Sequence, residues 1–183
     1  MRQTRAWAKG LGLSGAVVEA VEMEAKTDTL VISVRPPWQG LDRCGKCRRR
    51  CPRFDQGEGR RRWRALDLGI TVKVLEADSP RVTCPEHGVT VAWVPWARHG
   101  VRFTRDFEDQ VAWLVTHSSQ STVATMMRIA WRSVSGIVTR VVAAAQAGRD
   151  PFAHLKRIGI DEISHLTRIP QQGGRWRGGI GSL

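Results

Sequence analysis

Residues 44–47 are Cys-Gly-Lys-Cys, and residues 84–87 are Cys-Pro-Glu-His. In each pair two residues separate the metal-binding side chains, a spacing that lets one tight turn direct both side chains at the same ion. Two such turns on neighbouring hairpins form one closed tetrahedral site, which is typical of structural zinc. Its ligands would be Cys44, Cys47, Cys84 and His87. We therefore expect a zinc ribbon over residues 41–95, folded around the metal because so small a module lacks a sufficient core.

Cys51 is the one cysteine of the chain that belongs to neither pair. It follows the first pair closely, so it could replace His87 as the fourth ligand and give a site of four cysteines. A simpler alternative is that the cysteines are unligated thiols and that His87 lies on the surface. The repeated spacing favours the zinc site, and the metal would be structural because no coordination position stays open.

The composition indicates a folded protein of the cytoplasm. Hydrophobic residues make up 42% of the 183 residues, which is enough for a core. No stretch approaches the roughly 18 apolar residues that a membrane-spanning helix needs, so we expect no membrane partner. Lys9 and Glu19 interrupt the apolar stretch that a secretory signal would require. We therefore expect reduced cysteines and a cytoplasmic location.

The formal charge of +12 is concentrated between residues 43 and 64. This stretch holds ten basic residues: Arg43, Lys46, Arg48, Arg49, Arg50, Arg53, Arg60, Arg61, Arg62 and Arg64. Only Asp55 and Glu58 oppose them along the sequence. A nucleic acid relieves such repulsion by releasing its counterions, and guanidinium groups bind phosphate with two hydrogen bonds. A solvated basic surface and an anionic membrane are the alternatives. The candidate phosphate contacts are Arg48, Arg49, Arg50, Arg60, Arg61 and Arg62.

The segment before the first cysteine pair has the pattern of a β-hairpin. Leu30, Ile32 and Val34 alternate with other residues, as in a strand with one buried face. A hairpin over residues 17–35 is the simplest interpretation, and Pro36 with Pro37 ends the pairing because proline has no N–H to donate. Residues 63–94 also have the pattern of short strands.

After Pro95 the hydrophobic period changes to that of helices. Apolar residues from Phe107 onward recur at helical spacing, with Thr104 as the predicted N-cap. A polar break and a short second helix opening near Ser121 precede a third helix with a clear apolar stripe. This order predicts a helix-turn-helix, whose last helix lies in the major groove of double-stranded DNA. Its polar face would present Arg132, Ser133, Ser135, Gly136, Thr139 and Arg140. An ordinary helical bundle is the alternative.

These patterns together predict an α+β fold built of modules. The modules are an N-terminal hairpin in residues 1–40, the zinc ribbon in 41–95 and the helix-turn-helix in 100–148. The stretch from Arg157 to Glu162 has the pattern of one strand that ends on two carboxylates, within a segment of residues 149–166. Residues 167–183 are rich in Gly, Arg and Gln, so we expect them to be disordered.

The order of these parts resembles the ISL3-type bacterial insertion-sequence transposases. The resemblance covers most of residues 11–164. Its motifs are residues 44–47, Trp-Arg-Ala-Leu-Asp at 63–67, residues 82–88, residues 107–142 and Ile-Gly-Ile-Asp-Glu at 158–162. Two details differ from the family pattern. Gly45 and Arg48 stand where the family commonly has proline and glycine, and His87 stands where cysteine is common.

The resemblance implies that the N-terminal modules bind the terminal inverted repeats of an insertion sequence. It also implies a ribonuclease-H-like DDE catalytic domain, in which three carboxylates hold two Mg²⁺ ions for DNA cleavage and strand transfer. Asp161 matches the first of these carboxylates. Because the sequence ends at Leu183, we expect residues 149–166 to be only a stub of that domain and this chain alone to perform no strand transfer.

Three functions compete at this point. The first is the DNA-binding portion of a transposase truncated after the first catalytic aspartate, with assembly into oligomers on DNA left open. The second is a zinc-dependent regulator that binds DNA without catalysis. The third is an inert remnant that does not fold stably.

Overall fold

The chain divides into two compact units, residues 1–147 and residues 148–183. The computed structural model describes residues 8, 10–13, 15–148, 153, 156 and 157, so nearly all described residues belong to the first unit. The candidate Asp161, the remainder of the strand predicted to end at Glu162, and the tail predicted over residues 167–183 lie outside the described residues.

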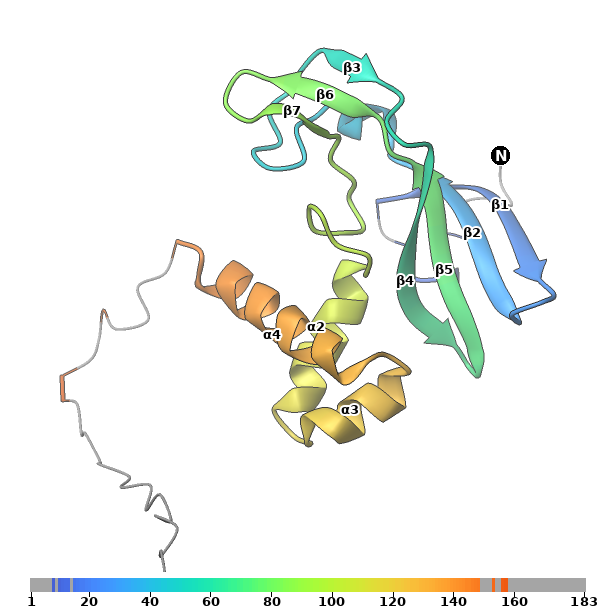
Figure 1. Cartoon of the computed structure of the whole chain (residues 1–183), viewed down its shortest axis with the longest axis vertical. Coiled ribbons are helices and arrows are strands. Elements are labelled where there is room, and N and C mark those ends of the chain that lie inside the picture. The colour runs from blue at the N-terminus through green and yellow to red at the C-terminus, as the bar shows by residue number, and fades with distance from the viewer. Residues whose placement is uncertain (1–7, 9, 14, 149–152, 154–155, 158–183) are drawn as a thin grey trace, which may run out of the picture. The chain divides into compact units, whose positions relative to one another are not determined.

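A four-stranded sheet forms the frame of the first unit (Figure 1). Its strands are β1 (Val17–Glu24), β2 (Thr29–Arg35), β4 (Arg60–Leu68) and β5 (Thr71–Asp78), in the order β1-β2-β5-β4. β1 and β2 form the predicted hairpin, which ends before Pro36 as expected. β2 also pairs with β5 in parallel, and β5 pairs with β4 in antiparallel fashion.

The parallel pair changes the expected division into modules. The sequence separates a hairpin in residues 1–40 from a ribbon in 41–95, whereas β4 and β5 of the second segment join the hairpin in one sheet. The cause is burial, because β2 is a central strand and Ile32 and Val34 pack into the same core as Leu75. Trp63 of β4 completes that core with its ring edge-on to Trp96, the two ring centroids being 5.6 Å apart.

The zinc-ribbon strands form a second sheet that continues from the first. Its strands are β3 (Arg53–Asp55), β6 (Arg81–Cys84) and β7 (Gly88–Val91), in the order β3-β6-β7. Only Ser79 and Pro80 separate β5 from β6, and Ser79 N–H donates to Gly59 O between β3 and β4 at 3.3 Å. A short 3₁₀ helix, η1 (Trp38–Gly40), leads from the hairpin into the first cysteine pair.

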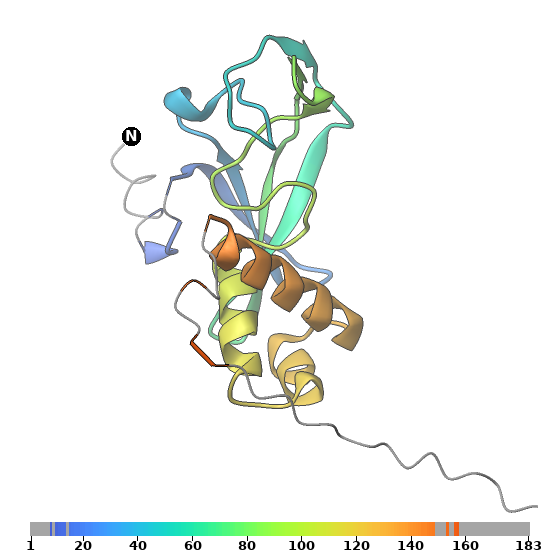
Figure 2. The ribbon, with the colours of Figure 1, turned by 90° about the vertical axis from the view of Figure 1, so that its left-hand side faces the viewer.

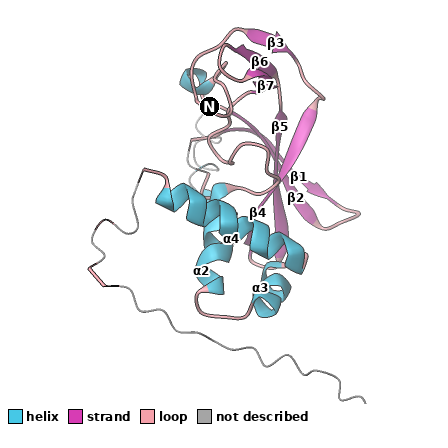
Figure 3. Ribbon diagram, turned by 60° about the vertical axis from the view of Figure 1, so that its left-hand side comes forward, coloured by secondary structure: helices cyan, strands magenta, loops and turns pink. Residues whose placement is uncertain are grey.

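Three helices pack around their own apolar core (Figures 2 and 3). They are α2 (Arg105–Val115), α3 (Gln120–Met127) and α4 (Trp131–Gln146). The sequence predicted the start of α2 from its cap, Thr104, and expected α3 to open near Ser121, whereas α3 begins at Gln120 and its cap is Ser119. Thr104 accepts a hydrogen bond from Phe107 N–H at 3.3 Å, and Ser119 accepts one from Thr122 N–H at 3.2 Å. Among the described residues, no helix combines the length and the apolar composition needed to cross a membrane.

Glu108 ties these helices together through a buried ion cluster. Its side chain is fully buried in α2 and accepts hydrogen bonds from Arg98 at 2.8 Å and from Arg140 of α4 at 2.6 Å. Arg98 also pairs with Asp109 at 2.9 Å. A buried carboxylate that keeps two guanidinium partners stabilises a unique packing, whereas removing one partner leaves its charge poorly compensated.

We predict that Arg140→Ala lowers the free energy of unfolding by about 1–3 kcal/mol, because Glu108 would keep only Arg98 as a buried partner. Arg132→Ala on the same helix is the matched control, since Arg132 is exposed and its loss should cost at most about 0.5 kcal/mol. Urea unfolding followed by circular dichroism measures both. Equal losses of unfolding free energy for the two variants would show that the buried ion cluster contributes no more to stability than an exposed arginine does.

Candidate zinc centre and DNA-binding surface

The four side chains chosen from the cysteine and histidine spacing converge in space. The ligand atoms of Cys44, Cys47, Cys84 and His87 all lie within 4.8 Å of one another. The Sγ atoms of Cys47 and Cys84 are 3.7 Å apart, and His87 Nδ1 lies 3.8 Å from Cys44 Sγ and 3.6 Å from Cys84 Sγ. In a tetrahedron with zinc–sulfur bonds of about 2.3 Å the ligand atoms lie about 3.8 Å apart, so this donor set fits zinc in both chemistry and spacing.

Backbone geometry explains how the two turns direct these side chains. The residue after each pair has a left-handed conformation, at φ 59° for Arg48 and 65° for Gly88. In the first turn Arg48 N–H donates to Cys44 O at 2.9 Å, and Cys44 N–H donates to Arg49 O at 2.8 Å. The left-handed conformation costs an arginine about 1–2 kcal/mol relative to glycine. The Arg48 guanidinium lies over the Trp93 ring, 5.7 Å from the centroid, and this contact offsets part of the cost.

The close approach of neighbouring atoms leaves room only for glycine at position 45. A Cβ atom at this position would lie 2.3 Å from Nδ1 of His99 and 2.5 Å from the carbonyl oxygen of Val91. Gly45 N–H donates to the same carbonyl at 3.2 Å, which holds the first turn against β7. This close approach is the physical reason for glycine at the position where the family commonly has proline.

Cys51 lies beside the converging group but outside it. Its thiol is buried and donates to Arg49 O at 3.3 Å. Burial raises the pKa of the Cys51 thiol. Burial also opposes ionisation of Cys84, but hydrogen bonds with the His87 ring and with the backbone amides of Glu86 and His87 outweigh it and lower the Cys84 pKa to about 6. The electrostatic environment of the two thiols therefore differs, and the thiolate is favoured on the one that faces His87.

Folding neutralises part of the arginine cluster with carboxylates from outside residues 43–64. Arg60 pairs with Glu76 of β5 at 3.2 Å, and Arg62 pairs with Glu76 at 2.9 Å and with Glu24 of β1 at 3.4 Å. Other pairs of this kind join Arg53 to Asp42, Arg49 to Glu86 and Arg64 to Asp67. Asp55, inside the cluster, instead pairs with Arg81 from outside it. The linear count of ten cations against two anions therefore overestimates the free positive charge.

Arg61 remains without a carboxylate partner among the described residues. Its guanidinium lies 5.6 Å from the centroid of the Trp63 ring and donates to Val101 O at 3.1 Å. It lines a basic groove of about 570 Å³ that also includes Arg60, Arg62, Arg81 and Arg102. Within the described part of the chain, Arg48 and Arg50 likewise have no ion pair. Arg48, Arg50 and Arg61 are therefore the arginines best placed to bind phosphate.

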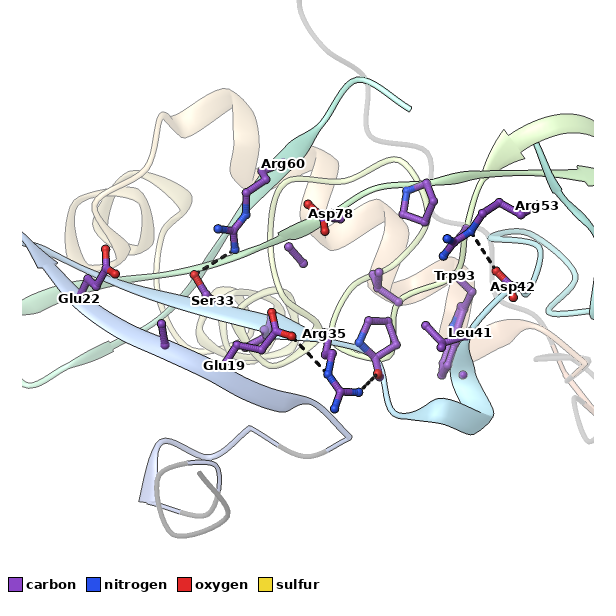
Figure 4. Close-up of a pocket in the computed structure, with 18 residues that line it drawn as sticks. Glu19, Glu22, Ser33, Arg35, Leu41, Asp42, Arg53, Arg60, Asp78 and Trp93 are labelled. Carbon is purple, nitrogen blue, oxygen red and sulfur yellow. Dashed lines mark hydrogen bonds and ion pairs between the residues drawn. The ribbon is translucent and has the colours of Figure 1, made fainter. Parts of the chain in front are cut away.

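A second pocket, of about 500 Å³, carries mixed charge (Figure 4). Arg35 pairs with Glu19 at 3.2 Å, and Arg53 pairs with Asp42 at 3.4 Å. Glu22 and Asp78 add two more carboxylates to its wall. Acidic groups outnumber the arginines in this pocket, so it is poorly suited to a phosphate backbone.

The helix-turn-helix has one open face on its last helix. Three residues, Arg128–Ala130, join α3 to α4, and the apolar stripe of α4 packs through Val134 and Ile137. The exposed side of α4 carries Trp131, Arg132, Ser135 and Thr139. Trp131 is 61% exposed, and the Arg132 guanidinium lies over its ring at 5.9 Å from the centroid. Neither α3 nor α4 contains an acidic residue, so this face has no carboxylate of its own to repel DNA.

Two α4 residues that the sequence predicted to contact DNA, Arg140 and Ser133, lie away from the exposed side of the helix. Arg140 is held by Glu108 on the flank of the helix, so its guanidinium is engaged inside the protein. Ser133 is half-buried on the same flank. The sequence could not show this, because Glu108 lies on another helix. Ser135 is exposed and donates to Gln120 Oε1 of α3 at 3.0 Å.

Comparison with known proteins identifies both modules. Residues 41–87 match the zinc-finger of transposase IS204/IS1001/IS1096/IS1165, and residues 94–142 match the helix-turn-helix domain of transposase family ISL3. The two modules belong to the ISL3 transposase family. This finding confirms the resemblance inferred from the cysteine pairs and the helical segment.

The chain is similar to curated relatives over most of its own length. It is 48% identical over 170 residues to the transposase for insertion sequence element IS1557 of Mycobacterium tuberculosis, in both strain CDC 1551 / Oshkosh and strain ATCC 25618 / H37Rv. The match covers 90% of this chain and 38% of each relative, so the chain spans well under half the length of the transposases that it matches. No solved structure matches the chain.

We predict that the purified protein binds one equivalent of zinc and that Cys44→Ser abolishes it. Cys51→Ser is the matched control, because Cys51 is also buried but lies outside the converging group. Chelation should unfold the two cysteine turns and the second sheet (β3, β6 and β7), since binding energy is folding energy in such sites, whereas β4 and β5 are held by the core of the first sheet. Elemental analysis and circular dichroism provide the measurements. Metal retained by Cys44→Ser, or lost by Cys51→Ser, would show that the ligand set is misassigned.

We predict that Gly45→Ala weakens zinc binding about 10-fold or more, because the methyl group would displace His99 or the Val91 carbonyl from the turn. Gly136→Ala in α4 is the control, since its Cβ meets only the Arg140 side chain, at 3.4 Å. Competition with a chromogenic chelator gives both affinities. Unchanged zinc affinity in Gly45→Ala would mean that this contact does not support the turn.

Proposed function

We propose that this chain binds the terminal inverted repeats of an insertion sequence, as the DNA-binding part of an ISL3-family transposase. The observation that carries the proposal is the open face of α4, which follows a three-residue turn and presents Arg132, Ser135 and Thr139 without a nearby carboxylate on α3 or α4. Recognition helices of this architecture contact base edges with such residues.

The ribbon supplies the second element of the proposal. Arg48, Arg50 and Arg61 lie on or beside the zinc ribbon without carboxylate partners in the described chain. Phosphate contacts of this kind position a protein on the duplex, whereas contacts with base edges give sequence preference. Zinc, bound by Cys44, Cys47, Cys84 and His87, would hold the ribbon in shape and take no part in chemistry.

The family resemblance also assigns a catalytic role to Asp161, together with Mg²⁺. That assignment stays a prediction, because Asp161 lies outside the described residues. DNA binding is the function that the described residues support.

We predict that Arg132→Ala reduces the preference for the element's ends over scrambled DNA by roughly 1–3 kcal/mol, the value of one bidentate contact with guanine. Arg61→Ala should weaken binding to all duplexes alike and reduce the salt dependence by about one unit of slope. Fluorescence anisotropy on specific and scrambled duplexes, titrated with salt, separates the two effects.

Arg35→Ala is the control for both variants, because Arg35 pairs with Glu19 in the pocket of mixed charge. It should change neither the preference nor the slope. If the protein binds neither duplex, the proposal is wrong. If Arg132→Ala lowers both affinities equally, α4 is not the element that gives sequence preference.

A further inference from the structure

Asp67 connects the sheet to the helix-turn-helix. It is the last residue but one of β4, close to the turn into β5, and its side chain, 20% exposed, pairs with both Arg64 and Arg128. Arg128 belongs to the turn between α3 and α4, and its guanidinium also donates to the carbonyl oxygen of Ile70 at 3.0 Å. The turn of the helix-turn-helix is thereby attached to the end of the β4–β5 hairpin.

Arg128 occupies a backbone position that favours glycine. Its φ is 53°, and it ends α3 in the left-handed conformation. This conformation is less favourable for an arginine than for glycine. Strained residues of this kind point to a role for the side chain. The only polar contacts of that side chain in the described residues are Asp67 and Ile70 O, so the attachment is what the arginine provides.

The first helix is attached to the same strand. Arg64 N–H donates to Arg102 O at 2.8 Å, and Thr104 N–H donates to Arg64 O at 2.9 Å. The Arg64 guanidinium lies over the Phe107 ring of α2, 5.3 Å from the centroid. β4 therefore contacts the helical module at two places, one at α2 and one at the turn before α4.

The opposite ends of the same strands lead into the zinc ribbon. β3 precedes β4 and β6 follows β5, with Ser79 N–H bonded to Gly59 O across the two connections. The pair β4–β5 is thus the structural link between the basic ribbon and the exposed face of α4. The separation of the two surfaces depends on how firmly the helical module is held to β4.

We propose that Asp67 and Arg128 are a positioning pair that fixes α4 relative to the ribbon, so that the protein recognises a two-part DNA site with one set spacing. This inference rests on the proposed function. An ion pair whose partners are both partly exposed to solvent contributes little to stability by itself. The pair should therefore affect the geometry of binding much more than the folding of the protein.

The test uses Arg128→Gly, which removes the side chain while relieving the left-handed backbone. Footprinting of the wild-type protein first locates the segments protected by the ribbon and by α4. Duplexes with five extra base pairs between these segments, about half a helical turn, then separate the two parts onto different faces. The wild-type protein should lose about 100-fold in affinity, because the second contact is no longer intramolecular.

For Arg128→Gly we expect unchanged or higher thermal stability, unchanged zinc content, and a loss of less than about 10-fold on the same insertion, since a loosely held α4 can reach a displaced segment. Its affinity for the original duplex should fall. Arg128→Lys keeps a cation that can reach Asp67 and should restore part of the spacing dependence. Asp28→Gly is the control, because Asp28 has φ 48° in the β1–β2 turn and no part in this attachment.

The outcomes separate the two proposals. If the wild-type protein binds no duplex, the proposed function fails and this inference fails with it. If the wild-type protein binds the original duplex but tolerates the insertion, DNA binding stands and the set spacing is wrong. If Arg128→Gly remains as sensitive to the insertion as the wild type, the spacing is real but Asp67 and Arg128 do not set it.

Discussion

The antiparallel pairing of β4 with β5 is the interaction on which both functional surfaces depend. β2 pairs with the other edge of β5. This pairing buries Leu75 and encloses the core around Trp63. The strands extend at one end into the zinc ribbon and contact the helices through Arg64 and Asp67 near the other. The Trp-Arg-Ala-Leu-Asp stretch at residues 63–67 therefore combines a core residue, a contact with α2 and the attachment of the helix-turn-helix.

The sequence predicted features that depend on nearby residues. The converging cysteines and histidine follow from two local turns, the hairpin from alternation followed by two prolines, and the start of α2 from Thr104. Each of these requires only a few consecutive residues. The parallel pairing of β2 with β5 depends on strands far apart in the chain, and no local pattern distinguishes it from two independent modules.

The same limit applies to charge. Counting along residues 43–64 identified a basic region, and the basic groove at Arg61 lies there. The count could not show that Glu24 and Glu76 flank Arg62 across the sheet, or that Glu108 holds Arg140. An arginine's availability for DNA is set by carboxylates that folding brings to it. For this reason Arg61 and Arg132 are stronger candidates than Arg62 and Arg140, although the sequence ranks them alike.

Two arginines in left-handed turns lie next to the two candidate functional regions, the zinc centre and the helix-turn-helix. Arg48 follows the first cysteine pair and Arg128 follows α3, each at a position where glycine costs least. Arg48 contacts Trp93, and Arg128 contacts Asp67 and Ile70. In both turns the side chain adds a contact beyond the turn, which offsets part of the backbone cost. Glycine would make each turn easier to form, but the first turn would lose its cation over Trp93 and the second its link to β4. The stability of an isolated turn and the placement of the surface that it carries are therefore opposing demands at these two positions, and the arginines satisfy the second.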